Sequence, residues 1–278
     1  MTQSVSPVIT AAELAAILDN DDLRVIDASW WMDKRDARLD FAEAHIPGAT
    51  FIDVDAVSDP ASALPHTFPT AAHFAETVGG HGISNDSHIV VYDTQGLFSA
   101  ARMWWLFKTF GACKVQVLDG GLPKWLADGH AVEIGQARPR PAARFEPSQD
   151  QSAVAYLDDV KAALGTFTQI IDARGAARFN AQMAEPRPGV RSGHMPGALN
   201  LPFGNLLNAD GTIKGGSELE AAFKEIGVDF DRPVITSCGS GVTAAILTLG
   251  LELLGKPSQL YDGSWTEWGS REDTPIEP

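Results

Sequence analysis

Short apolar runs rich in β-branched residues alternate along the chain with longer segments whose apolar residues recur at helical spacing. One such run is Val234–Thr236, and an apolar helical pattern follows it from Ala244 to Leu254. A short, continuous apolar run is typical of a strand buried on both faces of a sheet. Strands that alternate with helices in this way predict an α/β fold with a mostly parallel sheet flanked by helices.

The same signals occur twice, in the same order. Helical patterns over 11–18 and 154–164 open the two copies, and each precedes a strand that ends in Asp-Ala. His-x-Pro-Gly-Ala then recurs at 45–49 and 194–198. Matches in one order indicate a duplicated domain. The Pro- and Arg-rich stretch 136–151 indicates a linker, which places an N-terminal domain at 1–135 and a C-terminal domain at 152–278.

Cys238 stands where a buried strand of the second copy ends and its helix begins. Gly239 and Gly241 let the backbone curl tightly, because glycine tolerates positive φ. Such a curl turns N–H groups inward and forms an anion site at a helix N-terminus, which favours thiolate over thiol. We therefore predict a reactive sulfur rather than a structural cysteine. In the first copy Asp93 or Thr94 falls opposite Cys238, so that copy is predicted to lack sulfur chemistry.

Composition and charge narrow the classes of function. The 278 residues suffice for two domains, and a formal net charge of -15 argues against nucleic acid or an anionic membrane as partner. The chain has neither a membrane-spanning apolar run nor a signal-peptide pattern, which predicts a cytoplasmic protein. Its two cysteines, Cys113 and Cys238, give no disulfide framework and no metal-ligand spacing, so no metal is expected.

Arginines cluster in the loop-like stretch between the first strand of the second copy and His194. In so acidic a chain, clustered guanidinium groups predict recognition of a carboxylate or similar anion, with at least two of them facing Cys238. The alternative is that each pairs with a surface acid. The four residues are Arg174, Arg178, Arg187 and Arg191.

Among the histidines, His66 stands apart. His45 and His194 occupy equivalent places in the two copies, which favours a structural role. The segment around His66 has no counterpart in the second copy, and Asp53, Asp55 and Asp59 precede it. A histidine oriented by a carboxylate can act as a base for a serine hydroxyl. Which aspartate fills that role stays open.

The motifs together resemble the tandem-rhodanese-domain sulfurtransferases, over nearly the whole chain. The resemblance rests on the duplication, on Asp-Gly-Ser-Trp-x-Glu-Trp at 262–268 and on Cys-Gly-Ser-Gly-Val-Thr at 238–243. This uncharged loop is similar to that of the branch that acts on 3-mercaptopyruvate, whereas the thiosulfate branch has a Cys-Arg-Lys-Gly pattern. A compact dianion such as thiosulfate favours positive charge at the loop, while a neutral thiol needs a proton acceptor.

The resemblance implies transfer of the sulfur of 3-mercaptopyruvate through a persulfide on Cys238, with release of pyruvate. The acceptor would be a small thiol, cyanide or a reduced dithiol protein such as thioredoxin, and no metal or organic cofactor is implied. Arg178 and Arg187 match the substrate-binding arginines, and Ser240, His66 and Asp55 match a Ser-His-Asp set. The loop positions expected to bind substrate and sulfur are Gly239, Gly241, Val242 and Thr243.

Three other functions are considered. Thiosulfate:cyanide sulfur transfer is opposed by the uncharged loop. A cysteine phosphatase would need an arginine at the far end of the loop to hold phosphate, and residues 242–245 supply none. A non-catalytic sulfur carrier or binding module would take up sulfur without releasing pyruvate.

Overall fold

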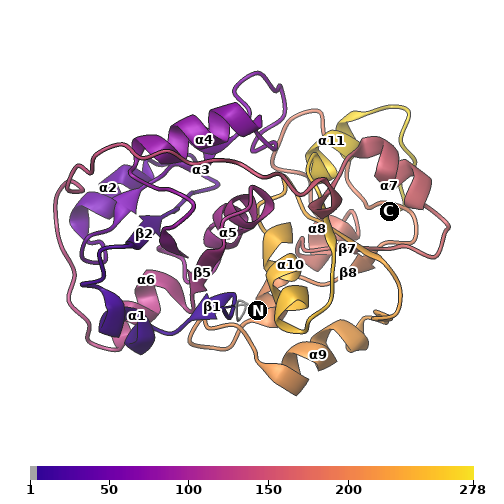
Figure 1. The fold of residues 1–278 in the computed structure, drawn as a ribbon. Coiled ribbons are helices and arrows are strands. Elements are labelled where there is room, and N and C mark those ends of the chain that lie inside the picture. The colour runs from indigo at the N-terminus through magenta and orange to yellow at the C-terminus, as the bar shows by residue number, and fades with distance from the viewer. Residues whose placement is uncertain (1–4) are drawn as a thin grey trace. The chain divides into compact units, whose positions relative to one another are not determined.

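The computed structural model describes residues 5–278, which divide into two units (Figure 1). The first unit comprises the chain to Ala61, Phe68–Asp150 and Ala209–Ile213. The second comprises Ser62–Thr67, Gln151–Asn208 and Lys214–Pro278. The short segment that contains His66 therefore belongs to the second unit, although it lies within the first half of the sequence.

In the part of the chain that the structure describes, the first unit has a five-stranded parallel sheet and six helices. A capping box starts its first helix, because the Thr10 hydroxyl accepts from Glu13 N–H while the Glu13 carboxylate accepts from Thr10 N–H. Its strands are β1 (Val8–Ile9), β2 (Leu23–Asp27), β3 (Thr50–Phe51), β4 (His88–Tyr92) and β5 (Lys114–Leu118). Its helices are α1 (Ala11–Ile17), α2 (Ala37–Glu43), α3 (Val54–Val57), α4 (Ala71–Gly80), α5 (Ala100–Thr109) and α6 (Gly121–Ala127).

The second unit repeats this plan. Its strands are β6 (Val154–Ala155), β7 (Gln169–Asp172), β8 (Leu199–Asn200), β9 (Val234–Ser237) and β10 (Gln259–Tyr261). Its α-helices are α7 (Leu157–Ala163), α8 (Ala176–Phe179), α9 (Gly216–Glu225), α10 (Ala244–Leu253) and α11 (Ser264–Ser270), with 3-10 turns η1 (Gln151–Ala153) and η2 (Phe203–Leu206).

Strand order and register are the same in both units. The orders are β1-β5-β4-β2-β3 and β6-β10-β9-β7-β8, and all of these neighbours pair in parallel. Asp27 pairs with Tyr92, and Asp172 pairs with Ser237. The next residues along, Asp93 and Cys238, therefore occupy equivalent positions. This settles the ambiguity in the sequence, which left Thr94 as an alternative.

Helices bury both faces of each sheet. In the first unit Leu14, Phe41 and Trp125, from α1, α2 and α6, pack on one face. On the other face Phe74 and Phe107, from α4 and α5, meet with ring centroids 5.2 Å apart.

In the second unit Trp265 and Trp268 of α11 join the cluster on one face. Gly250 of α10 lies against Leu219 and Phe223 of α9 on the other. The predicted α/β fold with helices on both faces is confirmed. Among the described residues, no helix combines the length and apolarity that crossing a membrane requires.

One predicted element is wrong. The sequence pattern predicts a helix over 154–164, but Val154 and Ala155 form strand β6, which pairs with β10, and the helix begins at Leu157. Helical periodicity cannot separate two apolar residues on a buried edge strand from the first turn of the helix that follows. The matching edge strand β1 lies just ahead of α1 in the first unit.

Asp27 is a fully buried carboxyl at the end of β2. Its Oδ1 accepts from the N–H of Ser29 at 2.9 Å. Burial raises the pKa of Asp27 to about 6, and the charge on Asp93 adds to this rise, while hydrogen bonds from Ser29 and Tyr92 oppose it. Because the folded-state pKa lies above the unfolded value of about 3.9, Asp27 stabilises the fold at acidic pH and loses this contribution as pH rises through about 6.

Asp27→Asn is therefore expected to become more stabilising, relative to the wild type, as pH rises. The full difference in unfolding free energy should approach about 3 kcal/mol, of which about 1–2 kcal/mol develops between pH ~5 and ~7. Urea unfolding across this range measures it, with the exposed Asp19→Asn as control. A difference in unfolding free energy that does not change with pH would contradict the raised pKa of Asp27. The same pH dependence in Asp19→Asn would contradict it too.

Candidate active site

Cys238 directly follows β9 and starts a tight loop that leads into α10. The side chain is 2 % exposed, while its neighbour Gly239 is half-buried. Gly241 adopts the left-handed conformation that the sequence predicts, with φ 79°. Gly239 does not, so that part of the expectation is wrong. A β-carbon at Gly239 would lie 3.1 Å from Nη2 of Arg178, so a larger residue there would require the guanidinium to shift.

The first turn of α11 fixes the direction of the loop peptides. The N–H of Trp265 donates to the carbonyl of Cys238 at 3.0 Å, and the N–H of Thr266 donates to the carbonyl of Gly239 at 2.8 Å. The N–H and C=O of a trans peptide point in opposite directions, and the described residues contain no cis peptide. The amides of Gly239 and Ser240 therefore point away from α11.

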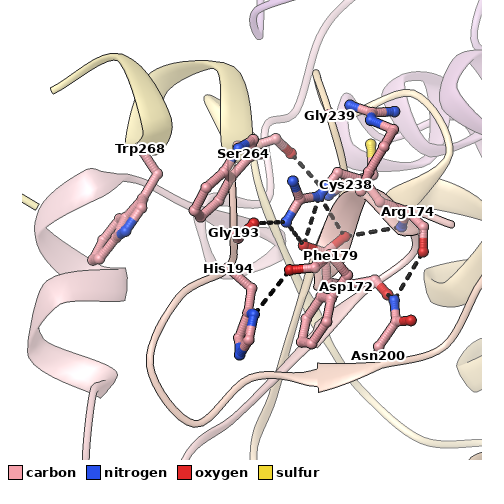
Figure 2. A network of polar contacts seen from close by, with 12 residues as sticks. Asp172, Arg174, Phe179, Gly193, His194, Asn200, Cys238, Gly239, Ser264 and Trp268 are labelled. Carbon is pink, nitrogen blue, oxygen red and sulfur yellow. Dashed lines mark hydrogen bonds and ion pairs between the residues drawn. The ribbon is translucent and has the colours of Figure 1, made fainter. Parts of the chain in front are cut away.

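Ser264 supports this arrangement from the start of α11. Its hydroxyl donates to the carbonyl of Tyr261 and accepts from the N–H of Cys238 at 3.3 Å, as Figure 2 shows for the latter contact. Ser264 has φ 48°, which is strained for a residue with a β-carbon. Its counterpart in the first unit, Gly121, has φ 55°. The left-handed conformation is thus shared by both units, while the strain and the hydroxyl are specific to the second.

The first unit contains an anion at the position of the sulfur. Oδ2 of Asp93 accepts from the amides of Phe98, Ser99 and Ala100 at 2.7, 2.9 and 2.9 Å. The carbonyl of Asp93 accepts from Leu122 N–H, as that of Cys238 accepts from Trp265 N–H. The amides at the start of α5 thus converge on one carboxylate oxygen.

The equivalent amides of the second unit have no such acceptor. Within residues 5–278, the main-chain N–H groups of residues 239–244 donate to no protein acceptor. Buried main-chain donors are rarely left unsatisfied in native proteins. Within the described residues these groups are therefore available to a ligand bound beside the loop.

Of the four clustered arginines, Arg178 contacts the Cys238 loop and Arg187 contacts α11, the helix that bonds the loop carbonyls. Arg178, at the end of α8, places its guanidinium against Gly239. Nη1 of Arg187 donates to the hydroxyl of Thr266 at 3.4 Å. Arg191 instead bonds the carbonyls of Trp268 and Gly269 at the C-terminus of α11, a capping role.

A buried chain of charges positions Arg178. Asp172 at the end of β7 pairs with Arg174 at 2.7 Å, and Arg174 pairs with Glu185 at 2.8 Å. Glu185 in turn pairs with Arg178 at 2.5 Å. Figure 2 shows Asp172 and Arg174 beside the Cys238 loop. Burial alone would lower the pKa of Arg174, but the two carboxylates outweigh it and raise that pKa.

Ser240 and His66 lie together. Nδ1 of His66 is 2.9 Å from Oγ of Ser240, and both side chains are buried. His66 has φ 59°, a second strained residue of the site. The segment Ser62–Thr67 thus supplies a histidine to the second unit.

The two candidate aspartates differ in their surroundings. Asp55 lies in the first turn of α3, in the first unit. Asp53 caps that helix by accepting from the N–H of Asp55 at 2.9 Å, and it also pairs with Arg38 at 3.0 Å. The carboxylate of Asp53 is therefore already engaged in a structural role.

The paired histidines are structural. Nδ1 of His45 lies 2.8 Å from the carbonyl of Phe41, and Nδ1 of His194 lies 2.9 Å from that of Phe179. Each imidazole also stacks on the ring of the phenylalanine whose carbonyl it contacts. The ring centroids are 4.0 Å apart for His45 and 3.8 Å apart for His194.

Sequence reasoning missed Glu185, Ser264 and Thr266 as parts of the site. Glu185 has no periodic or motif signal of its own, and it precedes Arg187 by two positions. The other two lie in the motif at 262–268, in which Thr266 is the unspecified position. Among the described residues, no group of three or more His, Cys, Asp or Glu side chains is placed to hold a metal ion.

Fold and site together define a class of protein: a duplicated α/β protein whose second unit has a cysteine where the first has a carboxylate, at the end of the central strand. The family model for the rhodanese-like domain matches residues 10–128 and 156–271. The chain belongs to the rhodanese-like family, with two such domains in tandem.

Relatives and solved structures agree with this assignment. The chain is 46% identical over 270 residues to 3-mercaptopyruvate sulfurtransferase of Escherichia coli K12, covering 95% of each chain. It is 42% identical over 303 residues to thiosulfate/3-mercaptopyruvate sulfurtransferase 1, mitochondrial, of Arabidopsis thaliana, covering 99% of this chain and 80% of the relative. The crystal structure of SseA from Escherichia coli, described as a 3-mercaptopyruvate sulfotransferase, matches with a TM-score of 0.85 at 41% identity, covering 94% of this chain and 99% of that one.

The buried charge chain predicts a large effect of Arg174→Met. The substitution leaves the carboxylates of Asp172 and Glu185 buried without their shared cation, so we expect a loss of about 3–5 kcal/mol in unfolding free energy. Arg271→Met, which removes a solvent-exposed pair with Asp273, serves as control and should cost much less. Urea unfolding measures both. Equal losses of unfolding free energy would show that the buried charge chain contributes no more to stability than an exposed ion pair.

Proposed function

We propose that Cys238 carries sulfur in a 3-mercaptopyruvate sulfurtransferase reaction. The names of the relatives support this substrate, and so does a loop that bears no charged side chain. The observation that carries the proposal is the contrast between the two units. Asp93 fills the first amide cluster with a carboxylate oxygen, while the equivalent amides of the second unit, on the loop that begins with Cys238, donate to no acceptor among the described residues.

The chemical step balances without an external oxidant. The Cys238 thiolate attacks the thiol sulfur of 3-mercaptopyruvate, an S–S bond forms and the C–S bond breaks. The electron pair of the C–S bond leaves with carbon as the enolate of pyruvate, which takes up the proton of the substrate thiol. The products are a Cys238 persulfide and pyruvate. The loop amides stabilise the anionic sulfur before and after the step.

The arginines supply the charge for substrate recognition. Arg178 uses Nε and Nη2 for Glu185, and among the described residues its Nη1 has no acceptor. We assign Arg178 and Arg187 to the carboxylate and keto oxygen of the substrate, where they also stabilise the enolate. Glu185 holds Arg178 in place but leaves one edge of its guanidinium available.

Ser240, His66 and Asp55 are assigned to proton handling at the substrate thiol. The 2.9 Å contact between Ser240 and His66 supports the first two assignments. Asp55 is favoured over Asp53 as the partner of His66, because Asp53 already caps α3 and pairs with Arg38.

A nucleophile then removes the outer sulfur. A small thiol, cyanide or a reduced dithiol protein such as thioredoxin is the proposed acceptor.

Thiosulfate is the second candidate donor, and the name of the Arabidopsis relative includes it. The uncharged loop disfavours such a dianion. A cytoplasmic location stays a prediction.

The proposal predicts that Cys238→Ser abolishes release of pyruvate from 3-mercaptopyruvate. The wild-type protein, treated with the substrate without an acceptor, should gain the mass of one sulfur on Cys238 and release about one equivalent of pyruvate. Intact-protein mass spectrometry and a pyruvate assay measure the two together. Gain of sulfur without pyruvate would indicate a carrier module instead, and a higher kcat/KM for thiosulfate would indicate the other donor.

The two aspartates should respond differently. Asp55→Asn is expected to lower kcat with 3-mercaptopyruvate by about 10²-fold or more, because the proposed Ser-His-Asp set then lacks its carboxylate. Asp53→Asn should mainly reduce thermal stability through the lost cap of α3, by about 1 kcal/mol. Steady-state kinetics with thermal unfolding separates the two effects. The reverse pattern would make Asp53 the partner.

A further inference from the structure

Thr266 connects a substrate-binding arginine to the Cys238 loop. Its hydroxyl donates to the carbonyl of Gly239 at 2.5 Å and accepts from Nη1 of Arg187 at 3.4 Å. A hydroxyl has one proton and two lone pairs, so it can make both bonds at once. The side chain is buried, 8 % exposed, at the start of α11.

The bond to Gly239 acts on the amide of the next residue. The Gly239 carbonyl accepts both from the hydroxyl and from the N–H of Thr266. Two donors on one oxygen hold the peptide plane between Gly239 and Ser240 more firmly than one. Since that plane includes the N–H of Ser240, Thr266 sets the direction of an amide that faces away from α11.

The bond from Arg187 strengthens this effect. A cationic donor polarises the hydroxyl, and a polarised hydroxyl is a better donor to the Gly239 carbonyl, because hydrogen bonds in series reinforce one another in a buried site. The position and charge of Arg187 are therefore linked to the loop amides through a single oxygen atom.

We propose that Thr266 is a positioning residue that couples recognition of the substrate carboxylate at Arg187 to the orientation of the loop amides at Cys238. This inference rests on the proposed function, since it assumes that Arg187 binds the carboxylate and that Cys238 takes the sulfur. Thr266 would act through Arg187 and the Gly239 carbonyl, the two groups that its hydroxyl contacts.

The test compares Thr266→Val with Thr266→Ser. Valine keeps the shape but removes the hydroxyl, while serine keeps the hydroxyl and removes only the methyl group. In single-turnover release of pyruvate from 3-mercaptopyruvate, Thr266→Val should slow persulfide formation about tenfold and also raise KM, as expected for loss of one polarised hydrogen bond. Thr266→Ser should stay within about threefold of the wild type, since it keeps that bond.

Thr248→Val serves as the matched control. Thr248 lies on α10, is equally buried at 8 % exposed, and its hydroxyl lies 2.9 Å from that of Thr236 rather than at the loop. This variant should lower thermal stability without a change in the rate of persulfide formation. A purely structural role of Thr266 would give the same result for Thr266→Val.

A double-mutant cycle tests the coupling itself. If Thr266 acts together with Arg187, Arg187→Met and Thr266→Val combined should reduce kcat/KM by less than the product of their separate effects. Wild-type kinetics in Thr266→Val, equal impairment of the serine and valine variants, or strictly multiplicative effects would each overturn the proposal. A wild-type protein that releases no pyruvate would instead refute the proposed function.

Discussion

The carbonyl groups of Cys238 and Gly239 accept hydrogen bonds from the first turn of α11, and the chemistry of the site depends on this constraint. The first amides of a helix have no partner within the helix, so they are available to bind the loop. Once the two carbonyls face α11, planarity turns the amides of Gly239 and Ser240 the other way. The helix after the last strand, α11, thus orients N–H donors on the loop that follows the neighbouring strand, β9.

Duplication gives an internal comparison for this site. Both units have the same strand order, the same register and a residue with positive φ at the start of the last helix. They differ in the side chain at the end of the central strand. Asp93 brings its own carboxylate to the amides of α5, which closes the site of the first unit. Cys238 has a side chain with one heavy atom beyond Cβ, and it leaves the equivalent amides without a protein acceptor. The side chain at this position therefore decides whether these amides have a protein acceptor.

Much of the fold could be predicted from the sequence, because strand and helix periodicities are local and the repeat supplied each signal twice. The α/β fold, the helix that starts at Ala244 and the importance of the 238–243 loop follow from such local signals. The edge strand Val154–Ala155 did not, because its two residues are defined only by pairing with β10. Spacing alone also could not place His66 beside Ser240, 174 positions apart. Glu185 and Thr266 escaped notice because their roles depend on partners that only the folded chain brings close.

A crystal structure of the protein after reaction with 3-mercaptopyruvate would locate the transferred sulfur and show whether the loop amides bind it. We expect a persulfide on Cys238 whose outer sulfur lies within hydrogen-bond distance of amides in residues 239–244, with both carbonyls still bonded to α11. An outer sulfur directed away from these amides, or a loop whose peptides have turned over, would contradict it.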